Sequence, residues 1–108
     1  MDESEKRQKQ EDCHEDKLGQ GILTLTNKRI VFEKTSGRIA DFSKKFGDTL
    51  LDVQLGDIIK TWKEGILMKK ACIRIKTNEG EKDYKFGVFS PGGWQKSIQK
   101  AMDAYKDQ

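Results

Sequence analysis

The sequence predicts a mainly β protein: a small sheet sandwich or open barrel of six to seven antiparallel strands, capped by one C-terminal helix. Short runs that alternate apolar and polar residues recur between residues 21 and 88, as expected of half-buried strands. After Pro91 the apolar spacing changes to a helical period. The length of 108 residues fits one core, in which the helix packs against the sheet.

The first two strands are predicted to form a hairpin. Residues 21–26 and 29–34 alternate apolar and polar side chains. Asn27 lies between them and tolerates the left-handed backbone of a tight turn, so the two runs are expected to pair. The connection that follows, residues 35–49, is long, and long loops in compact domains are often functional.

Four more runs predict the rest of the sheet, and turns that contain glycine, asparagine or aspartate separate most of them. Their bounds are 50–55, 58–64, 71–77 and 82–88. In the third run, alternation points Ala71 and Ile73 toward the core and Cys72 away from it. Trp62 belongs to a periodic apolar set, so we expect it in the core.

The C-terminal segment predicts a helix that closes the open end of the sheet. Ser90 is a favourable N-cap and Pro91 a favourable first helical residue. One apolar stripe follows at helical spacing: Trp94, Ile98, Ala101, Met102 and Tyr105. Because this stripe is too apolar to face water, we expect it to pack against the sheet, with Trp94 in the core.

Charge divides the chain into two parts. Residues 1–17 hold seven acidic and four basic side chains, and residues 18–108 hold 11 acidic and 17 basic ones. The first part has only Met1 and Cys13 as apolar residues, so it cannot bury enough surface to offset the entropy lost on ordering. We therefore predict a flexible, acidic N-terminal tail over residues 1–17 and one domain over residues 18–108.

Composition excludes several classes of protein. A net charge of +3 is too balanced for a dedicated nucleic-acid-binding arm. The chain has no run of roughly 20 apolar residues that would span a membrane, and its charged start does not resemble a secretory signal. Cys13 and Cys72 lie far apart and suit a reducing compartment. We therefore expect a soluble protein of the cytoplasm.

The sequence offers no constellation of catalytic or metal-binding residues. His14 is the only histidine, and the acidic residues beside it lack any recurring ligand spacing. Gly92 and Gly93 lack the lysine and the spacing of a phosphate-binding loop. We therefore predict no catalysis, no cofactor, no metal and no small-molecule substrate.

Three segments resemble the pleckstrin-homology (PH) superfold and, within it, the GRAM and related bacterial PH-like domains. Residues 21–32 read Gly-Ile-Leu-Thr-Leu-Thr-Asn-Lys-Arg-Ile-Val-Phe, similar to the family hairpin Gly-x-Leu-x-Leu-Thr-Asn-x-Arg-aliphatic-x-Phe. Residues 53–58 resemble a strand that ends in aliphatic-x-Asp-Ile. Residues 73–86 and the helix led by Trp94 follow in the same order, so the resemblance covers roughly residues 18–106. It implies a PH-like sandwich or open barrel.

The sequence departs from the family before and after the hairpin. Family members usually have an aliphatic strand ahead of the hairpin, but residues 10–18 are almost entirely polar. We therefore expect this first strand to be weak, displaced or absent. The connection 35–49 is also longer than the usual link.

The resemblance implies a non-catalytic binding module, since PH-like domains commonly dock on phosphoinositide membranes or on protein partners. Our hypothesis is reversible attachment, at the membrane periphery, to anionic lipid such as phosphoinositide. Fold alone does not decide the ligand. Bases on loops attract anionic head groups, each contributing about 1 kcal/mol near a membrane surface. The candidate lipid-binding residues are Arg38, Lys44, Lys45, Lys69, Lys70 and Lys28. Phe42 and Phe46 are candidates for shallow insertion into the membrane.

Other interpretations remain open. Phe42, Phe46 and the apolar run 66–68 also suit tethers that pack in the core, and Lys28 and Arg29 suit a solvated turn with a structural arginine. The module can instead bind a protein partner, with an extended peptide added to a strand edge or lying in the helix–strand groove. Membrane binding through loop bases should weaken as ionic strength rises, whereas strand pairing should barely respond.

Overall fold

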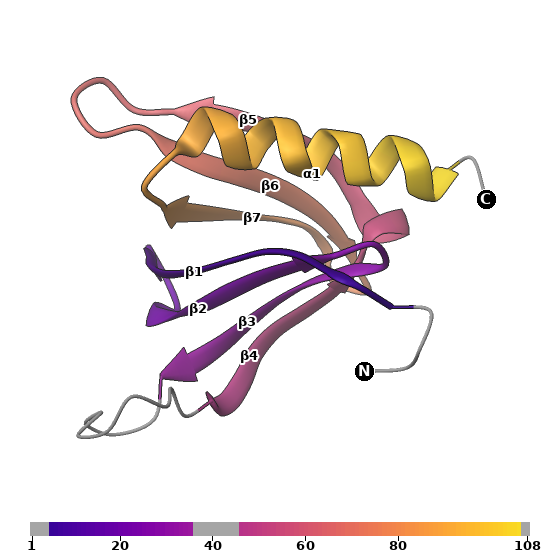
Figure 1. Ribbon diagram of the computed structural model, residues 1–108, viewed down its shortest axis with the longest axis horizontal. Coiled ribbons are helices and arrows are strands. Elements are labelled where there is room, and N and C mark those ends of the chain that lie inside the picture. Colours follow the sequence, from indigo (N-terminus) through magenta and orange to yellow (C-terminus); the bar gives the residue numbers. More distant parts are fainter. Residues whose placement is uncertain (1–4, 36–45, 107–108) are drawn as a thin grey trace.

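The computed structural model describes residues 5–35 and 46–106, which form one antiparallel sheet and a helix packed against it (Figure 1). The elements are β1 (Arg7–Glu15), β2 (Gly19–Thr26), β3 (Arg29–Thr35), β4 (Phe46–Gln54), the short 3-10 helix η1 (Leu55–Asp57), β5 (Ile58–Glu64), β6 (Lys70–Thr77), β7 (Gly80–Gly87) and α1 (Pro91–Lys106). The strand order is β4-β3-β2-β1-β7-β6-β5. The predicted mainly β class is confirmed.

The sheet forms an open barrel because its two halves meet at a short seam. Strands β1 and β7 pair at only two positions, His14 with Gly87 and Glu15 with Phe86. Strands β4 and β5 are the two edge strands of the sheet, and η1 links them. In Figure 1, β1–β4 and β5–β7 diverge from this seam as two arms, and α1 lies along β5 and β6. The predicted helical cap is confirmed.

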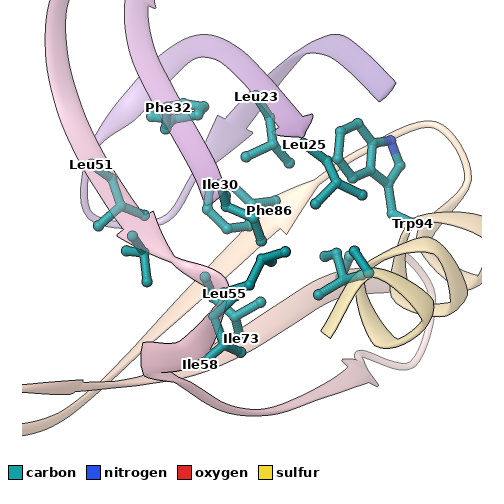
Figure 2. Close-up of a cluster of buried hydrophobic side chains, with 14 of the residues drawn as sticks. Leu23, Leu25, Ile30, Phe32, Leu51, Leu55, Ile58, Ile73, Phe86 and Trp94 are labelled. Carbon is teal, nitrogen blue, oxygen red and sulfur yellow. The ribbon is translucent and has the colours of Figure 1, made fainter. Parts of the chain in front are cut away.

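The core fills the space between the two arms of the sheet and the helix (Figure 2). Phe32 of β3 and Phe86 of β7 contact each other across it, with ring centroids 5.5 Å apart. The predicted stripe of α1 faces this core, and its buried members are Trp94, Ile98, Ala101 and Met102. The helical period in the sequence therefore predicted the buried face of α1 correctly.

Residues 7–15 are a strand of the sheet, so the prediction of a flexible tail over residues 1–17 is wrong for this stretch. β1 pairs with β2 along its length and with β7 at the seam. The expectation of a weak or absent first strand is wrong for the same reason. Backbone N–H and C=O groups form the ladder whatever side chains the strand carries, so polar composition did not prevent pairing.

Two predictions about burial on β5 and β6 are also wrong. Cys72, expected on the less buried side, is fully buried, and Trp62, expected in the core, is only half-buried. Both lie on the outer face of the sheet, where Cys72 has Trp62 opposite it on β5 and Lys85 opposite it on β7. These longer side chains flank the small thiol. Alternation predicts which face a residue occupies, but not what covers that face.

Neither cysteine thiol is expected to react in the folded protein. Burial raises the pKa of Cys72 to about 11 and that of Cys13 to about 12. Because the thiolate is the reactive form, both thiols should resist Ellman's reagent at neutral pH and react fully once guanidinium unfolds the chain. Rapid modification of either cysteine without denaturant would contradict the burial of that thiol.

Candidate functional site

Three connections lie at the same end of the barrel (Figure 1). They are the β1–β2 turn, the β5–β6 connection and the β7–α1 connection, residues 16–18, 65–69 and 88–90. The register explains their proximity, because β1 ends opposite the end of β7, and β7 ends opposite the start of β6. Segments far apart in the sequence therefore share one surface.

The β5–β6 connection holds three apolar side chains in solvent. The exposed fractions of Ile66, Leu67 and Met68 are 93%, 96% and 83%, and we call these three residues the apolar tip. Phe89, in the β7–α1 connection, is 94% exposed. The alternative that residues 66–68 are core tethers is therefore wrong. Contiguous exposed apolar residues commonly mark a surface that binds a membrane or another protein.

Gly65 shapes the base of the apolar tip. Its φ angle is 117°, a backbone conformation that glycine adopts far more readily than other residues. A Cβ at this position would collide with the backbone carbonyl of Met68. The glycine thus lets the chain turn sharply at the end of β5, so that the next residues project beyond the sheet.

Lysines flank the apolar tip along the chain. Lys69 directly follows the tip and is exposed. Lys63 of β5, two residues before Gly65, is also exposed and lies against Gly92 in the first turn of α1. Within residues 5–35 and 46–106, Lys63 and Lys69 have no carboxylate within 4.0 Å. Their charges are therefore available to an external anion.

Two further lysines beside the tip are held in ion pairs. Lys70, the first residue of β6, donates to a carboxylate oxygen of Asp16 in the β1–β2 turn. Lys85 of β7 donates to a carboxylate oxygen of Glu64, the last residue of β5. The hydrogen bond from Lys70 lowers the pKa of Asp16, and that from Lys85 lowers the pKa of Glu64. Both carboxylates are therefore charged at neutral pH.

The described residues contain no group of three or more histidine, cysteine, aspartate or glutamate side chains placed to hold a metal ion. His14 is exposed on β1. Over the same part of the chain, no helix has the length and apolar character needed to cross a bilayer.

The fold matches solved structures, although no family model and no curated protein matches the sequence. The N-terminal PH domain of Vps36 superposes with a TM-score of 0.68 and 16% identity, covering 100% of this chain and 86% of that one. A PH domain from Shewanella amazonensis SB2B gives a TM-score of 0.52 and 14% identity, covering 94% of this chain and 87% of that one. The fold is PH-like. At these identities the likeness concerns the fold alone.

The PH-like fold brings together two of the predicted lipid-binding residues and separates a third. Lys69 and Lys70 lie at the apolar tip. Lys28 lies in the turn between β2 and β3, and Figure 1 shows this turn at the opposite end of the barrel. There the backbone oxygen of Lys28 accepts a hydrogen bond of 2.9 Å from the N–H of Leu55 in η1. Phe46 begins β4, but its side chain lies outside the described part. The remaining predicted residues also lie outside it: Arg38, Phe42, Lys44 and Lys45.

The turn that carried the family resemblance is held by its own side chains. Oγ1 of Thr26 accepts hydrogen bonds from the backbone N–H groups of Lys28 and Arg29, both at 3.0 Å. The Arg29 guanidinium forms ion pairs with Glu5 and Asp52, both at 2.8 Å. Arg29 therefore fits the structural interpretation of this turn, because its charge is already matched by two carboxylates.

Sequence reasoning overlooked Phe89 and Lys63. Phe89 follows the inward-facing Phe86 and Val88 at an odd spacing and precedes the helix cap, so alternation alone would have pointed it outward. Lys63 had no such signal, because its neighbour Gly92 lies in another element.

Proposed function

We propose that this PH-like domain is a non-catalytic binding module that attaches reversibly to anionic membrane in the cytoplasm. The observation that carries the proposal is the almost complete exposure of the apolar tip beside Lys63 and Lys69. A membrane interface offers an apolar environment to the tip and anionic head groups to the lysines, and water offers neither. The tip would lie among the acyl chains, and the lysines would lie at the level of the head groups.

The energetics favour a reversible attachment. Burying one side chain such as Leu67 contributes about 1.5–3 kcal/mol, and each lysine close to anionic lipid contributes about 1 kcal/mol. Neither contribution alone holds a protein on a membrane, but the two together do. We include in this proposal the relation to GRAM domains, a preference for phosphoinositides, and the predicted roles of Arg38, Lys44, Lys45, Phe42 and Phe46.

The test is vesicle flotation with phosphatidylcholine alone, with added phosphatidylserine, and with added phosphoinositide, at low and physiological salt. Leu67→Asp should weaken binding to anionic vesicles by about tenfold or more, because it replaces an apolar contact with a negative charge. Leu67→Phe keeps the tip apolar and should preserve binding. Lys82→Gln, near the β6–β7 turn at the other end, also lowers the net charge by one unit and is the matched charge control.

Equal binding of the wild type and Leu67→Asp would contradict the role of the apolar tip. A lack of wild-type binding to any anionic vesicle at low salt would contradict membrane attachment itself. That second result would favour protein recognition. The edge strands of the described sheet, to which an extended peptide can add, are β4 and β5. Binding that resists high salt would also favour it, since strand pairing does not depend on ionic attraction.

A further inference from the structure

Four charged residues of alternating sign lie next to the apolar tip, and the contacts that carry the proposed function do not include them. They are Asp16, Lys70, Glu64 and Lys85, and they come from the β1–β2 turn, β6, β5 and β7. The residues of the two ion pairs are 54 and 21 positions apart in the sequence. The fold therefore assembles this group, which we call the charge cluster.

The fold also holds both carboxylates of the charge cluster in place. The backbone N–H of Asp16 donates a 3.3 Å hydrogen bond to the backbone oxygen of Lys85, which fixes the β1–β2 turn over β7. The charges of both Lys70 and Lys85 act on the Asp16 carboxylate. Glu64 accepts a second hydrogen bond, 3.2 Å long, from Nε1 of Trp62. Each acid is thus an anchored counter-ion of the lysines.

Stability alone gives little reason for these two pairs. All four side chains are partly exposed, and ion pairs of that kind contribute little to folding because water screens them. Their effect on a ligand is larger. An anion that approaches Lys70 or Lys85 meets a lysine whose charge is already matched, at the edge of a surface on which Lys63 and Lys69 are unmatched.

We propose that Asp16 and Glu64 are built-in counter-anions that anionic head groups must displace from Lys70 and Lys85, so that they set the lipid charge density at which the domain binds. This inference rests on the proposed membrane attachment through the apolar tip. A weakly charged membrane engages unmatched lysines such as Lys63 and Lys69. A strongly charged membrane also recruits the lysines of the charge cluster, and binding then rises steeply with the anionic fraction.

The experiment measures binding of the full chain to phosphatidylcholine vesicles of increasing phosphatidylserine content. Asp16→Asn keeps the size of the side chain and removes its charge, so Lys70 becomes available without displacement. We expect binding about fivefold tighter and a lower phosphatidylserine content at half-saturation. The double variant Asp16→Asn/Lys70→Gln should lose this gain, because the gain depends on the freed lysine.

Glu79→Gln is the matched control for a general effect of net charge. It removes one negative charge and frees Lys82, but it does so in the β6–β7 hairpin at the opposite end of the barrel. The inference requires a clearly larger gain for Asp16→Asn than for Glu79→Gln. Equal gains would overturn it, because net charge would then explain both results.

The remaining outcomes separate this inference from the proposed function. If the wild type binds anionic vesicles through Leu67 but Asp16→Asn binds no tighter, only the counter-anion inference is wrong. If neither protein binds any vesicle, both proposals are wrong. Binding by Asp16→Asn alone, with no wild-type binding at any anionic fraction, would contradict both, because the wild type would then reach no membrane whose head groups displace its counter-anions. Circular dichroism and thermal unfolding verify that the variants are folded.

Discussion

Replacing Glu15 with alanine is expected to lower the free energy of unfolding by about 4 kcal/mol. The side chain is fully buried, and its carboxylate accepts three backbone hydrogen bonds. Oε1 accepts from the N–H groups of Lys17, at 2.6 Å, and Leu18, at 2.8 Å, and Oε2 accepts from that of Lys85 at 2.8 Å. Removing the carboxylate leaves these donors without their partner at the seam between the two arms of the sheet.

Urea unfolding followed by circular dichroism measures this loss. Glu15→Gln should have an intermediate effect, because an amide keeps one acceptor but presents its NH₂ group to a backbone donor. Glu79→Ala, at a largely exposed acid, should change stability by no more than about 0.5 kcal/mol. A similarly small change for Glu15→Ala would show that the carboxylate does not hold the seam.

Replacing Trp94 with alanine is expected to cost a similar amount, about 4 kcal/mol. The Trp94 side chain is fully buried beneath the sheet, and it is the largest of the buried side chains (Figure 2). Its indole Nε1 donates a 2.9 Å hydrogen bond to Glu11 of β1. The same carboxylate accepts the N–H of Phe89, so Trp94 and Glu11 together fix the start of α1 against β1.

The other tryptophan provides the comparison. Trp62 lies half-buried on the outer face of the sheet. Nζ of Lys60 lies 5.1 Å, and Cζ of Arg74 5.5 Å, from the centroid of the Trp62 ring. Trp62→Ala should therefore cost only about 1 kcal/mol, because it leaves no cavity in the core. Urea unfolding of the two variants tests this difference. Equal losses would contradict the placement of Trp94 in the core and Trp62 outside it.

Local patterns predicted the elements whose own residues carry the signal. The hairpin of β2 and β3, the pair β6 and β7, and the helix α1 follow from alternation, turn residues and a helical stripe. The strand β1 could not be found in this way. Its side chains are mostly polar, and the hydrogen bonds that hold it come from β2 and β7, the latter about 70 residues away.

The candidate site shows the same division. The sequence identified Lys69 and Lys70, because bases beside an apolar run suggest contact with anionic lipid. It left open whether residues 66–68 pack in the core, because an apolar run gives the same sequence signal whether it is buried or exposed. The structure decided this by turning the chain at Gly65, so that the tip projects beyond the sheet.

The sequence by itself determined the fold class and the helical cap, and it singled out two lysines that lie beside the apolar tip, because periodicity and composition are local properties of the chain. Only the tertiary structure decided that Glu15 is a buried anchor and that Asp16 and Glu64 face lysines. These roles depend on backbone donors and opposite charges that folding brings from distant segments. The physical reason is that burial and charge matching are properties of neighbours in space, which one strand's pattern does not encode.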